Sequence, residues 1–295
     1  CIKTNLKMNK AKTTRLIQDV KFLTELRPFR NYQNLDSLKK VANYIKKEMS
    51  MAGFEPSLQS WQVEGNEYHN VICSYQPEKK KRLVIGAHYD VCGDQPGADD
   101  NASAVSGLLE TIRLLGSSIP DLEFGVDFVA YCLEEPPFFG TEHMGSYVHA
   151  KSIADNKENI LGMICYEMIG YFSDIPGSQR FPNSALKSMF PNTGNFIMAV
   201  GTEEYGEFND MVFNGMKNGA NIDVQKINMP EELGFADMSD QRNYWKFDIP
   251  AMMVNDTSFM RNPHYHKMSD SIETLDFNKM AEVVNCVINS LSSLD

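Results

Sequence analysis

Histidine and carboxylate side chains crowd together shortly after an apolar run of the sequence. The run Leu83–Ala87 is followed by His88 and Asp90, and then by Asp99 and Asp100 before the next predicted helix. Carboxylates repel one another, and removing them from water costs free energy. Cations between them would offset both costs, so this stretch raises the prospect of a metal site.

Further ionisable side chains follow other predicted strands. In an open α/β sheet, functional residues gather at the carboxyl ends of the strands. Each group alone is weak evidence, because adjacent glutamates are common on solvated loops. Their occurrence after four predicted strands favours a single shared site. Besides His88 and Asp90, these groups are Glu134, Glu135, Glu167, His264 and His266.

The donor types indicate which metals the site would hold. Mixed carboxylate and imidazole ligands suit zinc, manganese or cobalt better than calcium. A catalytic zinc takes three protein ligands and keeps one open position, and the chain offers enough donors for two ions that share a carboxylate. We therefore expect two Zn²⁺ ions, for which Mn²⁺ or Co²⁺ could substitute. Cys92 lies in the same stretch, but the hard ligands around it make it the weaker candidate.

The positions of the apolar residues predict alternating helices and strands. This alternation favours an α/β sandwich with a largely parallel central sheet. Residues 77–81 are expected to form a charged hairpin turn between strands 68–75 and 82–87. The predicted helices span residues 14–26, 35–51, 102–115, 140–154, 203–218 and 277–291. The predicted strands span 57–63, 68–75, 82–87, 126–132, 160–167, 195–200 and 250–254.

We expect one domain over residues 1–295, because no linker, repeat or abrupt change in composition interrupts the chain. Two helices occupy residues 1–54, and the excursion 169–248 should contain loops that shape a pocket. Three of the cysteines, Cys73, Cys132 and Cys165, lie in apolar runs, where free cysteine packs as a small hydrophobe. Disulfide pairing stays open.

Charge and hydropathy exclude some classes of partner. The formal net charge of −11 disfavours nucleic acid, which needs a basic surface. No run approaches the roughly 20 apolar residues of a transmembrane helix, so we expect a soluble protein, either cytoplasmic or exported. Cys1 in first position fits a mature bacterial lipoprotein, a trimmed chain or the loss of an initiator methionine. The sequence indicates no oligomeric state.

Five short motifs together resemble the M28 family of zinc-dependent exopeptidases. They occur in the family's order between about residues 70 and 275. The resemblance implies a three-layer α/β sandwich whose mixed, mostly parallel sheet has about eight strands. The motifs are His-Tyr-Asp at 88–90, Pro-Gly-Ala-Asp-Asp-Asn-Ala-Ser at 96–103, Glu-Glu-Pro-Pro-Phe-Phe-Gly-Thr-Glu at 134–142, Glu-Met-Ile-Gly-Tyr-Phe at 167–172 and Arg-Asn-Pro-His-Tyr-His at 261–266.

The resemblance implies a metal ligand set. Asp99 would bridge two ions, with His88 and Glu167 completing one and Glu135 and His266 the other. Many members of the family carry aspartate where this chain has Glu167, and glutamate still supplies a carboxylate but reaches further.

The resemblance also implies catalytic roles. Glu134 would be the general base, and Asp90 would fix the ring of the histidine two residues before it. Tyr265 and Tyr166 are candidate substrate or oxyanion contacts, with buried packing as the simpler reading of each. Relatives often have Ser-Asp-His where this chain has Ser-Asp-Gln at 239–241, which puts any role of that histidine in doubt.

His264 and His266 compete for one metal position. In an extended segment their side chains point to opposite faces, so one of them should be the ligand. The family motif favours His266.

The function implied is that of an aminopeptidase. A water activated by two zinc ions would attack the first peptide bond, with Glu134 as general base. The crowded carboxylates suit a substrate ammonium, so peptides with a free N-terminus are the expected partners. One alternative is a glutaminyl-peptide cyclotransferase, which shares the fold and uses a single zinc. The other is a non-catalytic binding domain, against which the complete donor set argues.

Overall fold

The computed structural model describes residues 8–230 and 234–294. Cys1, on which the lipoprotein prediction rests, lies outside the described residues. Within these ranges, no helix combines the length and apolar character needed to cross a bilayer.

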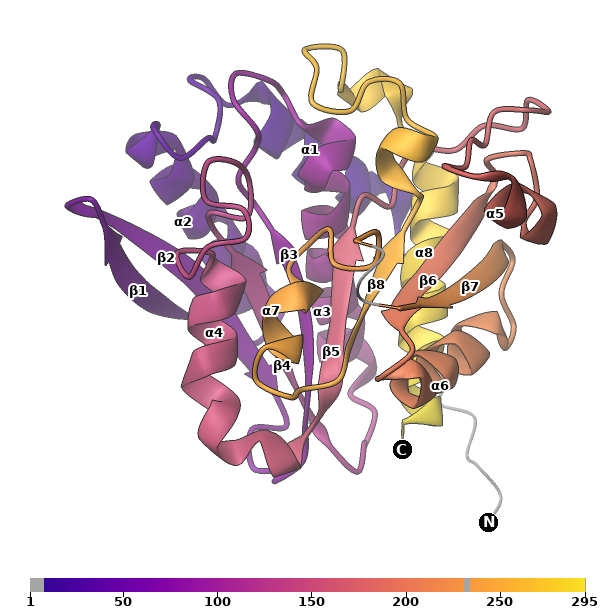
Figure 1. Ribbon diagram of the computed structural model, residues 1–295. Helices are drawn as coiled ribbons and strands as arrows, with labels where there is room; N and C mark the ends of the chain where they lie inside the picture. The colour runs from indigo at the N-terminus through magenta and orange to yellow at the C-terminus, as the bar shows by residue number, and fades with distance from the viewer. Residues whose placement is uncertain (1–7, 231–233, 295) are drawn as a thin grey trace.

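A mixed sheet of eight strands runs through the centre of the molecule, in the order β1-β2-β4-β3-β5-β8-β6-β7 (Figure 1). The four central strands β4, β3, β5 and β8 are mutually parallel, and β6–β7 is a further parallel pair. The pairs β1–β2, β2–β4 and β6–β8 are antiparallel. The predicted mixed α/β fold is therefore confirmed. The strands are β1 Ser57–Val63, β2 Asn66–Tyr75, β3 Arg82–His88, β4 Gly125–Tyr131, β5 Ile160–Glu167, β6 Phe196–Thr202, β7 Asp223–Met229 and β8 Ala251–Asn255.

Helices cover both faces of the sheet and complete three layers. In Figure 1, α4 and α7 lie in front of the sheet, and α3 and α8 lie behind it. The rear layer also contains α1, α2 and α6, whose apolar residues belong to the same core cluster as those of α3 and α8. The helices are α1 Thr13–Glu25, α2 Leu35–Met51, α3 Ala104–Ser118, α4 Gly145–Ile153, α5 Ser184–Met189, α6 Gly206–Lys217, α7 Gln241–Trp245 and α8 Phe277–Ser290.

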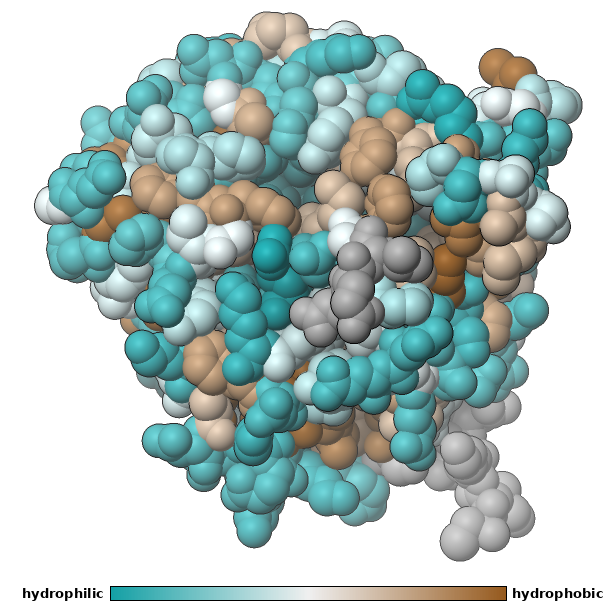
Figure 2. Space-filling view, in the orientation of Figure 1, coloured by the Kyte–Doolittle hydropathy of each residue, from teal (hydrophilic) through white to brown (hydrophobic). Residues whose placement is uncertain are grey.

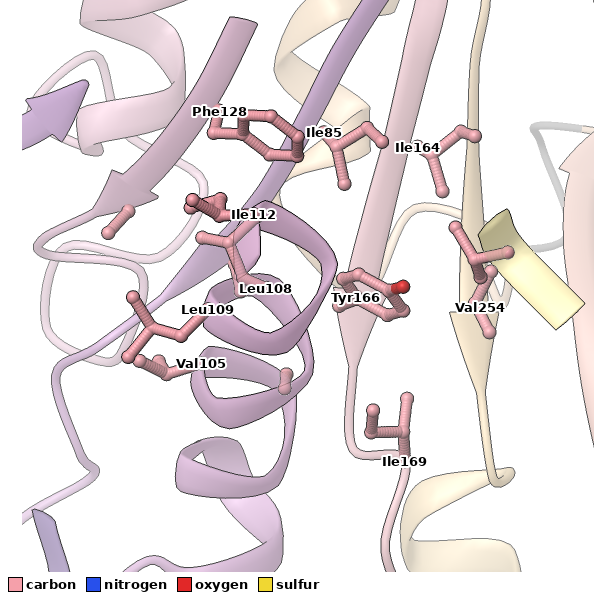
Figure 3. Packing of buried hydrophobic residues seen from close by; sticks show 14 of the residues in the cluster. Ile85, Val105, Leu108, Leu109, Ile112, Phe128, Ile164, Tyr166, Ile169 and Val254 are labelled. Atoms are coloured by element: carbon pink, nitrogen blue, oxygen red, sulfur yellow. The ribbon is translucent and has the colours of Figure 1, made fainter. Parts of the chain in front are cut away.

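Helix α3 packs at the centre of the larger core. Its apolar residues recur at helical spacing, as Val105, Leu108 and Ile112, and all are fully buried. Leu108 and Ile112 lie on the side of the helix toward Ile85 and Phe128 of the sheet (Figure 3). Burying a side chain of this size contributes about 1.5–3 kcal/mol. This packing fixes the start of α3, and with it the turn just before it that carries Asp99 and Asp100.

The predicted hairpin at residues 77–81 is wrong. β2 and β3 are not neighbours, because β4 lies between them and pairs with both. Strand β3 pairs in parallel with β4 and β5 instead, which places it in the middle of the sheet with both faces buried. A short connection does not dictate pairing when a distant strand offers a better-buried partner.

Three elements were not predicted, namely β7, α5 and α7. All lie in the excursion 169–248, which contributes two strands to the sheet as well as loops. Strand β7 is an edge strand with polar residues along it, so its hydrophobic pattern is weak. Helices α5 and α7 have only six and five residues, too few to show a periodicity.

Candidate metal centre

The carboxyl ends of four parallel strands meet at one edge of the sheet. β3 ends at His88 and β5 ends at Glu167, on adjacent strands. Glu134 and Glu135 follow β4, the other neighbour of β3. The segment after β8 leads to His266. Parallel pairing thus brings together the residues that the sequence scatters over nearly 180 positions, since 266 − 88 = 178.

His88 is the centre of one group of donor atoms. Its Nε2 lies 3.2 Å from Oε2 of Glu167, 3.5 Å from Oδ1 of Asp100 and 3.6 Å from Oε2 of Glu134. His88, Asp100 and Glu167 are all buried, and each offers a donor atom within 4.8 Å of the others. Such a set of one imidazole and two carboxylates fits a zinc-type ion.

His266 is the centre of a second group. Its Nε2 lies 2.9 Å from Oδ2 of Asp100 and 3.3 Å from Oε2 of Glu135. The two oxygens of Asp100 thus face two different histidines, Oδ1 toward His88 and Oδ2 toward His266. A carboxylate placed in this way is suited to bridge two ions.

The expectation that Asp99 lies between the histidines is wrong, and Asp100 takes that place. Oδ1 of Asp99 accepts the backbone N–H of Gly170 at 2.9 Å, and its Oδ2 accepts the amide of Asn262 at 2.8 Å. Asp99 therefore ties the segment after β5 to the segment after β8. Asp100 departs from helical torsion angles (φ −104°, ψ 89°), so the two neighbouring side chains point in different directions. No spacing rule in the sequence separates them.

Asp90 lies where the sequence placed it, beside His88. Its Oδ1 is 3.4 Å from Nδ1 of His88, on the ring edge opposite the carboxylate group. The same carboxylate accepts the backbone N–H groups of Glu134 and Glu135, at 3.2 and 3.1 Å. Asp90 thus links the histidine of β3 to the loop after β4, an arrangement typical of carboxylates behind a metal-binding histidine.

Burial and mutual repulsion shift the pKa values of the ionisable groups at this edge of the sheet. Burial raises the pKa of Glu134 well above its usual range and that of Glu135 to about 8. Burial alone would lower the pKa of both histidines. The surrounding carboxylates outweigh it, raising the pKa of His266 to about 10 and that of His88 well above its ordinary value. The negative charge that favours protonated imidazoles here would also attract divalent cations.

Among the described residues, three buried atoms of these groups make no well-directed hydrogen bond, although carboxylate oxygens lie near the two ring nitrogens. They are Nε2 of His88, Nε2 of His266 and Oε1 of Glu135. Buried polar atoms are normally satisfied, so orphaned atoms that face one another need an explanation. The donor set and these orphaned atoms fit divalent ions of the zinc type.

The two tyrosines predicted as substrate contacts lie in different places. Tyr166 as an oxyanion contact is wrong, because its hydroxyl lies 2.9 Å from Oγ1 of Thr111 and its ring packs in the core (Figure 3). Alternation along β5 sends it to the α3 face, away from the carboxylates. Tyr265 lines the pocket at the candidate site and stacks on the ring of His266. His264 instead places Nδ1 3.0 Å from Oγ of Ser269.

Comparison with known proteins agrees with this geometry. Residues 70–291 match the model of peptidase family M28. The chain belongs to peptidase family M28. It is 39% identical over 289 residues to the uncharacterized protein YfbL of Escherichia coli strain K12, covering 95% of this chain and 88% of the relative.

Two solved structures share the fold. The Legionella pneumophila LapA aminopeptidase matches 96% of this chain and 72% of its own, with a TM-score of 0.75 and 19% identity. The glutaminyl cyclase of Bacteroides thetaiotaomicron matches 97% of this chain and 99% of its own, with a TM-score of 0.73 and 20% identity. Both likenesses concern the fold.

The loop before α7 supplies site residues that sequence reasoning missed in this M28 chain. The hydroxyl of Ser239 donates to Oε2 of Glu167. The neighbouring Asp240 is fully buried, and burial raises its pKa to about 7. Gln241, where relatives often have histidine, points inward and donates to the carbonyl of Ala236 at 2.7 Å. The one signal in the sequence was the Ser-Asp pair before Gln241, the position where relatives often have histidine.

A pocket opens over the carboxylates of the M28 site. One wall carries Asp100 and the glutamates, and the other is apolar, with Phe235, Met253 and Met260 among its residues. Those three also line an adjoining apolar pocket that extends to Leu186 of α5. Figure 2 shows apolar side chains gathered between α5 and β6 on this face. The pocket therefore has an acidic wall and an apolar wall.

Proposed function

We propose that this M28 chain is a two-metal aminopeptidase that removes apolar N-terminal residues from peptides. The observation that carries the proposal is Asp100, whose two oxygens face His88 and His266. Each histidine also has a carboxylate of its own within about 3.3 Å, Glu167 for one and Glu135 for the other. Two complete donor sets sharing one carboxylate favour two ions over one.

These residues would hold the ions as two neighbouring positions. His88, Glu167 and Oδ1 of Asp100 form one, and His266, Glu135 and Oδ2 of Asp100 form the other. When bound, such ions lower the pKa of a water molecule and polarise the carbonyl of the peptide bond to be cleaved.

Glu134 is placed to move the proton. Its Oε2 lies 3.6 Å from Nε2 of His88, and its side chain lines the pocket. Burial raises its pKa, so the ionised form of Glu134 is a stronger base than an exposed glutamate. Glu134 would take a proton from the attacking water and return it to the leaving amine. Asp90 acts as a positioning residue, because it holds both the backbone of Glu134 and the ring of His88.

The two walls of the pocket indicate the substrate. The ammonium group of a peptide is attracted to the acidic wall, which Glu134, Glu135 and Glu167 line. The first side chain of the peptide would then lie against the apolar wall that includes Phe235 and Met253. Peptides that begin with leucine, methionine or phenylalanine fit both features.

A single-metal glutaminyl cyclase is the second candidate. The fold it would need is shared with the Bacteroides thetaiotaomicron enzyme over nearly the whole of both chains. Asp100, Glu135 and His266 would suffice to hold one ion. In that case His88 and Glu167 would lie beside the reaction without a metal of their own.

The decisive experiment combines metal content with a substrate panel. We expect two Zn²⁺ ions per chain and hydrolysis of leucyl, methionyl and phenylalanyl substrates at least about 10-fold faster than of alanyl, lysyl or aspartyl ones. One ion per chain with cyclisation of a peptide that begins with glutamine would overturn the proposal in favour of the cyclase. A fully loaded protein inert toward both panels would indicate a binding domain. The Glu134→Gln variant controls for contaminating peptidases.

A further inference from the structure

A cysteine thiol lies against the second group of donor atoms. Sγ of Cys92, a carboxylate oxygen of Glu135 and a ring nitrogen of His266 all lie within 4.8 Å of one another. Cys92 is partly exposed, whereas the other cysteines among the described residues, Cys73, Cys132, Cys165 and Cys286, are buried in the interior. A thiol in this place is a donor that the carboxylate and imidazole set does not include.

An independent observation points to a ligand at the same place. Glu135 is only 4% exposed, and its Oε1 has no hydrogen-bond partner in the part of the chain that the structure describes. Nε2 of His266 is orphaned in the same way. The two side chains beside the thiol, Glu135 and His266, therefore each carry a buried polar atom that lacks a partner.

The loop that carries Cys92 is held in position by hydrogen bonds. The amide of Asn31 donates to the carbonyl of Gly93 and to Oδ1 of Asp94, both at 3.0 Å. The amide of Gln95 donates to the carbonyl of Cys92 at 2.8 Å. Just before the cysteine, the N–H of Val91 donates to the carbonyl of Arg30. Such anchoring fixes the backbone near the site, which lowers the entropy cost of ligation.

We infer that Cys92 is a thiolate ligand of the ion held by Asp100, Glu135 and His266. The inference rests on the proposed metal centre and adds a residue to it. Zinc binds thiolate sulfur at about 2.3 Å and imidazole nitrogen at about 2.0 Å, so ligation requires the sulfur and the ring nitrogen, which lie within 4.8 Å of each other, to be no more than about 4.3 Å apart. The thiol proton is released to solvent when the ion binds.

This ligand makes the two metal positions chemically different. The position at His88 has only nitrogen and oxygen donors, whereas the position at His266 adds sulfur. Soft thiolate ligands favour Zn²⁺ and Cd²⁺ over Mn²⁺. Manganese should therefore occupy the His88 position and be displaced from the His266 position by small amounts of Zn²⁺ or Cd²⁺.

Cobalt substitution tests the ligand directly. A thiolate bound to Co²⁺ gives a charge-transfer band in the near ultraviolet, which carboxylate and imidazole ligands do not give. We expect this band in the Co²⁺-loaded wild-type protein and in Cys286→Ser, whose cysteine lies in α8 at a distance from the loop. In Cys92→Ser the band should disappear while Co²⁺ remains bound at the His88 position. Circular dichroism would verify that each variant is folded.

The outcomes separate this inference from the proposed function. An unchanged near-ultraviolet spectrum in Cys92→Ser, or no band in the wild type with two Co²⁺ ions bound, would overturn the ligand. A band without peptidase activity would overturn the proposed function and leave the ligand standing. A protein that binds no Co²⁺ would overturn both.

A second readout uses thiol chemistry. Saturation with Zn²⁺ should slow alkylation of Cys92 at least tenfold, as measured by mass spectrometry of the peptide that contains it. Alkylation at the same rate with and without Zn²⁺ would contradict ligation.

Discussion

Two buried clusters of carboxylates in this protein are neutralised in different ways. The arginine cluster lies between α1, α2 and α3, where Arg113 binds Asp19 through two hydrogen bonds of 2.8 and 2.9 Å. The same guanidinium binds Glu48 at 2.6 Å and Glu110 at 3.3 Å. The edge cluster lies at the carboxyl ends of the strands and contains no arginine or lysine partner within its described ion pairs. Its members are Asp90, Asp100, Glu134, Glu135, Glu167, His88 and His266.

The difference separates a structural cluster from a binding site. In the arginine cluster the chain supplies its own cation, with donors in a planar fork that match the carboxylates. In the edge cluster the chain supplies carboxylates and imidazoles, and within residues 8–230 and 234–294 it leaves buried nitrogen and oxygen atoms without hydrogen bonds. The ion-pair partners of its carboxylates are two histidines, whose ring nitrogens can bind either a proton or a metal ion. Comparing how each cluster responds to substitution therefore tests the functional assignment.

The largest effect should come from removing the shared carboxylate. Asp100→Asn should lose both ions, because each donor set depends on one of its oxygens, and activity should fall more than about 10⁴-fold. Metal analysis and kinetics would measure both. Asp99→Asn is the matched control, and it should keep both ions because Asp99 bonds to Gly170 and Asn262. The opposite pattern would restore Asp99 as the bridging residue.

The next effect separates proton transfer from ligation inside the edge cluster. Glu134→Gln should lower kcat by about 10²–10⁴-fold, as expected for loss of a general base. Metal content should stay at the wild-type level, measured by inductively coupled plasma mass spectrometry. Glu142→Gln, at an exposed position of the following loop, is the control and should leave kcat unchanged. Near-normal turnover in Glu134→Gln would refute its role.

The arginine cluster should respond in stability instead of activity. Arg113→Met leaves Asp19, Glu48 and Glu110 without their cation, and the free energy of unfolding should fall by about 3–5 kcal/mol. Urea denaturation would measure this loss, and metal content should be unchanged. Lys21→Met removes the exposed pair with Glu25 and should cost less than about 1 kcal/mol. Equal losses in the two variants would contradict the view that Arg113 compensates buried charge.

The smallest expected effect concerns a buried neutral histidine outside both clusters and appears in the pH dependence of stability. Burial lowers the pKa of His149 to about 4, and its Nδ1 lies 2.7 Å from the hydroxyl of Tyr244. Because this pKa lies below the ordinary value of 6.5, unfolding takes up a proton as the pH falls. The stabilising contribution is thus complete above pH 6.5 and is lost by about 1.4 kcal/mol per pH unit toward pH 4.

The His149→Gln variant would reveal this contribution. The difference in unfolding free energy between wild type and variant should shrink by about 3 kcal/mol between pH 7 and pH 4. The His143→Gln variant, at an exposed position, controls for the change of residue type. A pH-independent difference for His149→Gln would show that the ring does not titrate as the structure implies.

Much of the fold follows from local pattern. Strand 160–167 and helix 35–51 match the structure at both ends, because each has a strong apolar pattern bounded by clear breaks. The pairing of strands does not follow from such patterns. Strand β4 inserts between β2 and β3, a choice set by burial of the whole sheet. Strand β7 escaped prediction because it is a polar edge strand.

The candidate site also has parts that follow from the sequence and parts that depend on the tertiary structure. The residue types that follow each strand placed His88, Glu134, Glu135, Glu167 and His266 at one edge, and the structure brings all of them together. Tyr166 was misplaced because its orientation depends on which face of β5 meets α3. The loop before α7 was missed because Ser239 reaches Glu167 across 72 positions of sequence.

The sequence by itself determined the family, the α/β class and which residue types follow each strand, because these depend on residue type and order along the chain. Only the tertiary structure decided between Asp99 and Asp100, and only it brought Cys92 next to Glu135 and His266. The direction of neighbouring side chains depends on the backbone torsion angles of a turn. Those angles are set by hydrogen bonds to Asp270 and by the packing of α3, which join segments far apart in the sequence.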